Sequence, residues 1–266
     1  MSDTTTTTTE ETSADIAPSF SVDINAATFA AAYAAVSMAA STDSTRPILG
    51  AVRLEVLADG SAELVATDSY RLHAVTIDAA MVHAAEDVRG LSVRIKAGAL
   101  KATEVRRLAK PVMRRTGEVR GVIRVECARG LTSETGCYGR HVGADTVTVS
   151  AVHPGGDVDA ALTVANLHTL EGPRLDSVRA TITGTREEPA VNAPDGSALP
   201  ALNPAYLADI GKAADIATGG GGGCTIRQIQ AAALKPNAWN AASVSLGTAF
   251  VGLLMPVRDP STVPAE

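Results

Sequence analysis

The chain has 266 residues, of which 45% are hydrophobic and only 3% aromatic, and its formal net charge is -6. This length suits two domains of ordinary size, and the apolar share suffices for a core built mainly from small aliphatic side chains. The acidic total excludes a uniformly basic nucleic-acid binder but leaves room for a local basic face. The three cysteines, Cys127, Cys137 and Cys224, do not form a disulfide framework, which favours a reduced cytosolic protein.

Both ends of the chain are polar and of low complexity. Residues 1–18 are rich in Thr and carry four acidic residues, so we expect a disordered tail, and residues 259–266 are expected to form a second, flexible tail. No secretory signal or membrane span is expected, because the longest nearly apolar stretch, residues 29–40, is far shorter than the roughly 20 residues that cross a bilayer.

The first half predicts an α+β domain over residues 19–155. A strand over 20–24 precedes Asn25, an N-cap for an Ala-rich helix over 26–40 whose buried stripe is Phe29, Tyr33 and Val36. Further strands are expected over 48–56, 62–67, 72–77, 92–96, 121–128 and 146–152, with one more between the last two. A second helix over 97–110 is expected to stop at Pro111. One helix plus several antiparallel strands thus occurs twice.

The second half, residues 156–258, is predicted as a second domain of the same kind. Strands are expected over 161–165, 178–183, 225–228, 241–246 and 250–257. A helix over 203–217 places Tyr206, Leu207, Ile210 and Ala214 on one face, and the glycine run 219–223 indicates a flexible turn after it. No first helix is evident for this half, which weakens the expectation of two equal domains.

Basic residues are concentrated in one window of this acidic chain. Residues 89–129 contain twelve Lys or Arg and three Glu, a net charge of +9, which leaves -15 for the rest. Such a split is typical of a positive face turned towards a polyanion. Spacings of three and four place Arg106, Arg107 and Lys110 on a shared helix surface. The alternative is a solvated helix face whose charges serve only solubility.

Catalytic motifs are absent from the sequence. It contains no P-loop, no H-E-x-x-H and no G-x-S-x-G. Asp68 is interpreted as a turn carboxylate that accepts hydrogen bonds from nearby backbone amides. Cys137 and His141 have the spacing of two metal ligands, but no second pair accompanies them. We therefore expect a protein that is not an enzyme and has no cofactor or metal; a small hydrolase or metalloenzyme remains as a weaker alternative.

Three segments carry a family pattern in the order expected: RPILGAVRLEVLADGSAELVATDSYRL at 46–72, LNPAYLADIGKA at 202–213 and LLMPVR at 253–258. They resemble, respectively, the middle domain, a helix of the last domain and the C-terminal signature of the bacterial DNA polymerase III beta subunit, the beta sliding clamp. The stretch VRIKAGAL before residue 101 is also similar to a segment of that family. The chain is about one domain shorter than the usual three-domain subunit.

This resemblance implies a DNA-clamp fold whose similar domains are arranged in a ring, with a helix-lined basic bore around double-stranded DNA. The implied DNA-binding residues are Arg94, Lys96, Lys101, Arg106, Arg107, Lys110, Arg114 and Arg115. The function implied is that of a processivity factor, which binds DNA without reading its sequence and tethers a replicative polymerase. Because two-domain subunits need three copies to supply six domains, a homotrimer is favoured over a dimer.

The resemblance further implies a pocket for short peptides of DNA polymerases and the clamp loader, between the middle and last domains. One wall would comprise Arg46, Leu49, Thr67, Ser69, Tyr70, Arg71 and Leu72. The other would comprise Asn203, Tyr206, Leu254, Met255, Pro256, Val257 and Arg258. Ser69 and Tyr70 replace the family's usual Gly-His, which makes the rim bulkier, and eight residues extend beyond Arg258. The competing hypothesis is a clamp-like module or decoy that binds such peptides but never encircles DNA.

Overall fold

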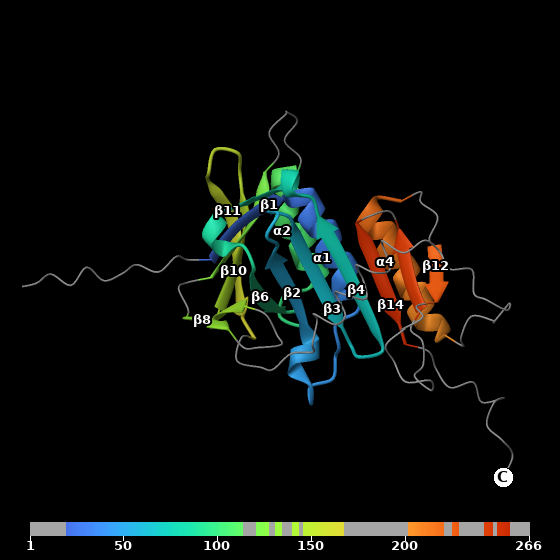
Figure 1. Ribbon diagram of the computed structural model, residues 1–266. Coiled ribbons are helices and arrows are strands. Elements are labelled where there is room, and N and C mark those ends of the chain that lie inside the picture. Colours follow the sequence, from blue (N-terminus) through green and yellow to red (C-terminus); the bar gives the residue numbers. More distant parts are fainter. Residues whose placement is uncertain are drawn as a thin grey trace, which may run out of the picture.

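The computed structural model describes residues 20–113, 121–127, 131–134, 140–143, 146–167, 202–220, 225–228, 242–246 and 249–255. It consists of two sheets covered by a layer of helices (Figure 1). The expected α+β fold class is confirmed. Among the described residues, no helix has the length and hydrophobicity needed to span a membrane.

The smaller sheet has five antiparallel strands in the order β11-β10-β7-β1-β5. Its strands are β1 (Phe20–Asn25), β5 (Val82–Ala84), β7 (Val122–Cys127), β10 (Thr146–Val152) and β11 (Val158–Ala165). Strand β11, which the sequence assigned to the second half, pairs with β10 along its length. The division into two domains at residue 155 stays a prediction.

The larger sheet has nine strands in the order β12-β13-β14-β4-β3-β2-β6-β9-β8. Its strands are β2 (Ala51–Val56), β3 (Ala62–Thr67), β4 (Arg71–Ile77), β6 (Leu91–Lys96), β8 (Leu131–Glu134), β9 (Arg140–Gly143), β12 (Thr225–Gln228), β13 (Ala242–Leu246) and β14 (Phe250–Leu254). All neighbours are antiparallel except β6 and β9. The segment expected as a strand over 178–183 lies outside the described residues.

Helix α1 (Ala26–Ser37) begins as the sequence predicts. The Oδ1 atom of Asn25 accepts hydrogen bonds from the amides of Ala27 and Thr28, at 3.1 and 3.2 Å, and so caps the helix. The expected stripe of Phe29, Tyr33 and Val36 is fully buried. The hydroxyl of Tyr33 donates to the carbonyl of Leu100 at 2.8 Å, which ties α1 to the turn before the next helix.

Helix α2 (Ala102–Met113) departs from the expectation at both ends. It begins five residues later than predicted, because residues 97–100 form a turn after β6. It also continues through Pro111, which the sequence took as a stop signal. Proline removes one helical hydrogen bond, but Val112 is only 1% exposed and packs into the main core, so tertiary packing keeps this last turn helical.

The third described helix, α4 (Pro204–Thr218), is capped by Asn203, whose Oδ1 accepts from the amide of Ala205 at 2.9 Å. It ends at Gly219, which has a positive φ of 75° as expected for a glycine C-cap. Helix α1 packs between α2 and α4, and α4 also packs on β14. The helices therefore form one layer over the sheets, with two helices from the first half and α4 from the second.

A short 3-10 helix, Pro47–Gly50, occupies the start of the strand expected over 48–56. The fixed φ of Pro47 suits this helical turn, and the strand begins only at Ala51. The hairpin predicted at Asp59-Gly60 is confirmed, with Gly60 at a φ of 86°.

Candidate functional site

The two halves of the chain meet at a seam between β4 and β14, which lie side by side in Figure 1. These strands pair antiparallel, with Leu72 opposite Leu253 and Arg71 opposite Leu254. The pairing continues past the end of β14, because the amide of Met255 donates to the carbonyl of Tyr70 at 2.8 Å. The seam thus brings together the first and third segments that resemble the clamp family, which are nearly 200 residues apart in sequence.

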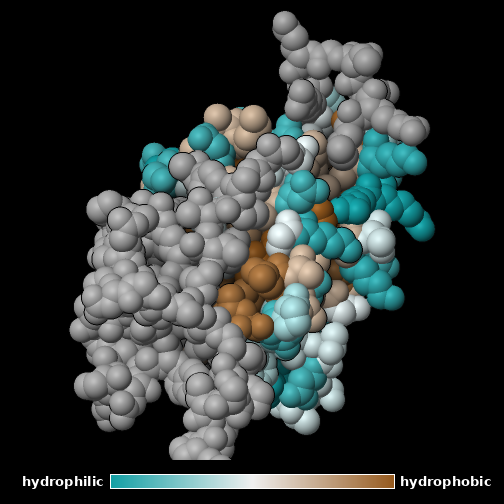
Figure 2. Space-filling model, turned by 90° about the vertical axis from the view of Figure 1, so that its right-hand side faces the viewer, coloured by the Kyte–Doolittle hydropathy of each residue, from teal (hydrophilic) through white to brown (hydrophobic). Residues whose placement is uncertain are grey.

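Tyr70 and Met255 make the seam apolar on the outside. Their side chains are 56% and 45% exposed, whereas most large hydrophobic side chains of the described residues are buried. Leu72, Val251 and Leu253 pack in a small cluster next to them, separate from the main core. Figure 2 shows the side of the molecule that carries α4, with hydrophobic surface at its centre.

The loop before β4 has a defined geometry. The Oδ1 atom of Asp68 accepts hydrogen bonds from the amides of Tyr70 and Arg71, each at 2.9 Å, and the hydroxyl of Thr67 donates to the carbonyl of Arg71 at 2.7 Å. The interpretation of Asp68 as a turn carboxylate is therefore confirmed. Ser69 lies in the left-handed region with a φ of 80°, where glycine is the unstrained residue.

Arg71 joins the loop to α4. Its guanidinium forms ion pairs with Asp68, at 3.0 Å, and with Asp209 of α4. It also lies over the ring of Tyr206, 4.6 Å from the ring centre. The Arg71 side chain is 12% exposed, so these partners hold it within the seam. The sequence placed Arg71 at the rim but missed Asp209, although its spacing of three from Tyr206 puts both on one side of the helix.

The remaining predicted pocket residues differ in their exposure and in their contacts. Arg46 is exposed and pairs with Asp43 at 3.3 Å, and its Nη1 reaches the hydroxyl of Ser69 at 3.5 Å. Leu49 is 7% exposed. Leu254 is 1% exposed and belongs to the main core, so its side chain does not reach the surface of the seam. The side-chain oxygen of Asn203, Oδ1, caps α4. Pro256, Val257 and Arg258 lie outside the described residues.

His73 lies beneath the seam, between β4, β14 and α1. It is fully buried, its Nδ1 is 2.8 Å from the carbonyl oxygen of Ala35, and its ring packs edge-on against Phe250. Its Nε2 is buried and has no hydrogen-bond partner among the residues that the structure describes. Burial lowers the pKa of His73 to about 4, so the imidazole is neutral at physiological pH.

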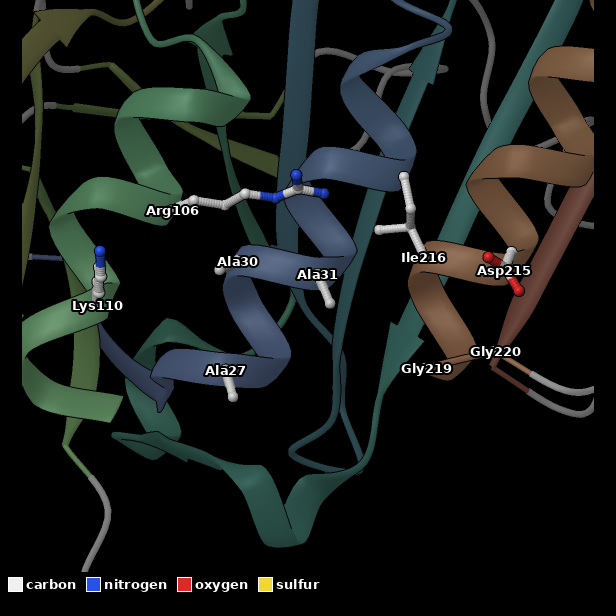
Figure 3. Close-up of a pocket in the computed structure, with 9 residues that line it drawn as sticks. All are labelled: Ala27, Ala30, Ala31, Arg106, Lys110, Asp215, Ile216, Gly219 and Gly220. Carbon is white, nitrogen blue, oxygen red and sulfur yellow. The ribbon is translucent and has the colours of Figure 1, made fainter. Parts of the chain in front are cut away.

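The helix layer forms the second candidate surface, shown in Figure 3. A groove of about 650 Å³ runs over α1 between α2 and α4. Small side chains floor it, because α1 presents Ala27, Ala30 and Ala31. Arg106 and Lys110 of α2 line one wall, and Asp215, Ile216, Gly219 and Gly220, from α4 and the turn after it, line the other. The groove is therefore basic on one side and partly acidic on the other.

Helix α2 supplies most of the exposed positive charge of this layer. Arg106, Arg107 and Lys110 are all exposed, which confirms that they share the outer surface of the helix. Lys101, just before the helix, is exposed as well, and its amide donates to the Glu104 carboxylate at 2.8 Å. Lys96 is exposed at the end of β6. Arg114 and Arg115 lie outside the described residues.

Arg94 does not belong to this surface, which corrects the expectation from sequence. It is 5% exposed, and its amide donates to the Oδ1 atom of Asn166 at 3.0 Å. Arg94 lies opposite Arg53 in the pairing of β6 with β2, and burial together with the charge of Arg53 lowers its pKa. Arg124, another member of the basic window, forms a bidentate ion pair with Asp23 at 2.7 and 2.8 Å on the smaller sheet. The basic residues of the window 89–129 therefore lie on several different surfaces.

The weaker alternative of a metalloenzyme gains no support from the described residues. Within them, no group of three or more His, Cys, Asp or Glu side chains is placed to hold a metal ion. His141 lies on β9, and Cys137 lies outside the described residues.

Comparisons with known proteins agree with the fold. The family model of the DNA polymerase III beta subunit, central domain, matches residues 23–108. The sliding clamps from Caulobacter crescentus (17% identity, TM-score 0.56), Bartonella birtlesii (16%, 0.55) and Bacillus subtilis (16%, 0.54) align with 93%, 90% and 92% of this chain. This chain has the fold of a bacterial sliding clamp. The resemblance inferred from the sequence is therefore confirmed.

The match to these clamps is partial in length. The alignments cover 68%, 66% and 66% of the three solved clamp chains, so this chain spans about two thirds of their length. A search of curated proteins found no match. Among the described residues, the seam and the helix layer hold most of the site residues predicted from the sequence.

Proposed function

We propose that copies of this chain assemble into a ring around double-stranded DNA and act as a sliding clamp. The observation that carries the proposal is the single layer formed by α2, α1 and α4, in which Arg106, Arg107 and Lys110 of α2 are exposed. A helix layer of this kind presents cations to phosphates without contacting base edges. Because such contacts are independent of sequence, the ring can slide along DNA.

In this proposal the seam binds the proteins that the ring holds on DNA. Exposed Tyr70 and Met255 offer an apolar site for short peptides of polymerases and clamp loaders, with Arg46 as a polar neighbour. A polymerase held in this way cannot diffuse from its template, which raises its effective concentration at the primer end. The protein so described is a processivity factor without catalytic activity, and it works in the cytoplasm, where bacterial DNA lies.

The number of copies in the ring does not follow from the domain count used above. That count assumed two equivalent domains, whereas the described residues contain two α-helices in the first half and one in the second. A trimer remains the arrangement proposed from sequence, and the mass of the assembly measured by light scattering tests it. A monomer at micromolar concentration would contradict any ring.

The decisive experiment measures retention on nicked circular DNA in the presence of a clamp loader. A ring stays on circular DNA at high salt and leaves when the DNA is cut, because a linear duplex has free ends. The variant Lys101→Glu/Arg107→Glu/Lys110→Glu replaces three exposed cations with anions, and we expect far fewer rings to be loaded and retained, because the cations that attract the phosphates are lost.

Matched charge reversals separate the two surfaces. Arg46→Glu reverses an exposed cation beside the seam, so we expect it to alter peptide binding and leave DNA retention unchanged. Conversely, the triple reversal on α2 should leave peptide affinity unchanged. Equal losses of DNA retention in both variants would show that the effect of charge reversal is not specific to α2.

A specific observation favours a second candidate, a clamp-like module that binds peptides without encircling DNA. Helix α4 carries two Asp and one Lys, Asp215 lines the groove, and α1 has no charged residue. Outside α2, the two helices of the layer therefore carry one positive and two negative charges, a net charge of -1. Such a module would bind clamp-binding peptides but show the same retention on circular and linear DNA.

The peptide site is tested on its own with Met255→Ala and Tyr70→Ala. Both side chains are exposed, so truncation should leave the fold intact while weakening the binding of a clamp-binding peptide by roughly tenfold or more. Fluorescence anisotropy with a labelled peptide gives the affinity, and circular dichroism checks the fold. Unchanged affinity in both variants would place peptide binding elsewhere.

A further inference from the structure

The groove over α1 has a wall of unpaired cations. Arg106 and Lys110, here called the basic wall, are exposed on α2, and Figure 3 shows the Arg106 side chain extended from α2 towards α1. Within the described parts of the chain, neither side chain forms an ion pair. Glu104, the one acidic residue of α2, instead accepts a hydrogen bond from the amide of Lys101 at 2.8 Å. The basic wall is therefore available to an anionic ligand.

The floor of the groove suits an extended segment with small side chains. Ala27, Ala30 and Ala31 leave α1 without a bulky side chain along a groove of about 650 Å³. Ala27 and Ala31 are partly exposed, so part of this apolar floor faces solvent. A ligand that lies along α1 would remove these methyl groups from water while its acidic groups reach the basic wall.

Residues 1–19, here called the N-terminal segment, have a composition that matches this groove. The segment carries four acidic residues and no Lys or Arg, so its side chains have a net charge of -4. Its acidic residues are Asp3, Glu10, Glu11 and Asp15. Six consecutive threonines, 4–9, precede the two glutamates, and β-branched residues favour extended backbone. The segment thus combines small side chains with charge of the opposite sign to the basic wall.

The point where the N-terminal segment joins the fold puts the groove within its reach. It precedes Phe20, the first residue of β1, and β1 leads through Asn25 directly into α1, whose first turn contributes Ala27 to the groove. The six residues of β1 span about 20 Å. Glu11 lies nine positions before Phe20, and this length of chain extends to about 30 Å. The two glutamates can therefore fold back along β1 and reach the groove beside their own helix.

The C-terminal segment, residues 256–266, matches the groove less well. It contains Arg258 as well as Asp259 and Glu266, so its side chains have a net charge of only -1. It also follows Met255, whose amide bonds to the carbonyl of Tyr70 at the seam, and not an element that floors the groove. Both charge and position thus favour the N-terminal segment as the occupant.

We propose that the N-terminal segment binds in the groove over α1, with Glu10 and Glu11 against the basic wall. Bound there, it occupies cations that the proposed function assigns to DNA phosphates, so that DNA has to displace it. The competition with DNA rests on the proposed function, whereas the docking does not. Each exposed ion pair is weak, but the tether gives the segment a high effective concentration at the groove.

The docking is tested by NMR of alanine methyl groups in the full-length chain. The methyl groups of Ala27, Ala30 and Ala31 report on the groove, and exposed Ala160 of β11 serves as a reference outside it. Glu10→Gln/Glu11→Gln should shift the three groove signals and leave the reference unchanged. High salt should shift the groove signals of the unaltered chain in the same direction, because it screens exposed charges.

Two further variants make the test specific. Asp259→Asn/Glu266→Gln is the matched control, because it also removes two acidic charges from a terminal segment, and it should leave the groove signals in place. Arg106→Gln/Lys110→Gln removes the basic wall. In that background the added change of Glu10 and Glu11 should shift the groove signals little further, as expected for groups that interact.

The competition is tested with a short linear duplex in the absence of a clamp loader. At low salt, Glu10→Gln/Glu11→Gln should lower the dissociation constant by roughly three- to tenfold, the effect of losing two weak ion pairs that compete with phosphates. Asp259→Asn/Glu266→Gln should leave it unchanged, which excludes an effect of net charge alone. The difference between the glutamine variant and the unaltered chain should vanish at high salt.

The possible contrary results are distinguishable. Groove signals that Glu10→Gln/Glu11→Gln does not move would overturn the docking and leave the proposed ring untouched. Groove signals that change with the concentration of the chain would place a second copy in the groove instead. Shifted groove signals with an unchanged affinity for duplex would refute the competition. A chain that binds no duplex in any variant would refute the proposed function, while shifted groove signals would still support the docking.

Discussion

Buried His73 makes the stability of the seam dependent on pH. Its pKa is lowered to about 4 by burial, against 6.5 for an ordinary histidine, so the folded state binds its proton less readily than the unfolded state does. Above pH 6.5 both states carry a neutral imidazole, and His73 adds no pH dependence. As the pH falls below 6.5, the unfolded state gains a proton first, and the folded state loses stability relative to it.

The size of this effect follows from the two pKa values. Proton linkage gives a loss of about 2 kcal/mol in the free energy of unfolding by pH 5, rising to about 3 kcal/mol below pH 4. This is a large fraction of the stability of an ordinary domain. Because His73 contacts Phe250 of β14 and the carbonyl of Ala35 in α1, the loss should appear first at the seam.

The assay is urea unfolding between pH 7.5 and 5 for the unaltered chain and for His73→Leu. The leucine variant removes the titrating group, so its stability should decline much less over this range. His83→Leu is the matched control, because His83 is exposed on β5, and it should retain the full pH dependence. Hydrogen exchange of the β14 amides locates the effect.

Two results would refute this reasoning. Equal pH dependence in the unaltered chain and His73→Leu would mean that other groups cause the decline. A flat profile for the unaltered chain would mean that the buried imidazole accepts a proton without cost.

Three further predictions concern the seam. Arg71→Met should lower the free energy of unfolding by about 2–3 kcal/mol, because Asp68 loses its partner in a largely buried setting; a double-mutant cycle with Asp209→Asn should show coupling. Ser69→Gly should raise the free energy of unfolding by about 1 kcal/mol, and with it the melting temperature, because it removes a serine from the left-handed region. A lower melting temperature would contradict the inference that Ser69 is strained. Gly252→Ala should destabilise the chain by about 1–3 kcal/mol in urea unfolding, because the new methyl would lie 2.8 Å from Cδ1 of buried Ile210. Unchanged stability would show that α4 shifts to make room for the methyl without a cost in free energy.

Local signals predicted most of the described elements. The Asn25 cap, the buried stripe of α1 and the Asp59-Gly60 hairpin each depend on residues close together in sequence, and all three are confirmed. The stop at Pro111 was wrong, because the gain from burying Val112 is a tertiary effect that no local pattern contains.

The basic window shows what a linear charge count omits. The residues of this window belong to two different sheets and to helix α2, so a run of cations in the sequence is divided between surfaces. Arg94 is buried opposite Arg53 on the larger sheet, and Arg124 pairs with Asp23 on the smaller one. Only the helical part of the window, around Arg106, has a spacing that predicts a common face, and there the prediction is confirmed.

The state of Arg71 bears on how the seam would recognise a peptide. Because Asp68 and Asp209 neutralise its guanidinium and Tyr206 lies against it, a peptide carboxylate would have to displace existing ion pairs to bind Arg71. Tyr70 and Met255 are already exposed and need no such exchange. A ligand should therefore gain most of its affinity from apolar side chains, and its affinity should change little with salt. Strong salt dependence of peptide binding that persists in Arg46→Glu would instead mean that Arg71 leaves its partners when the peptide docks.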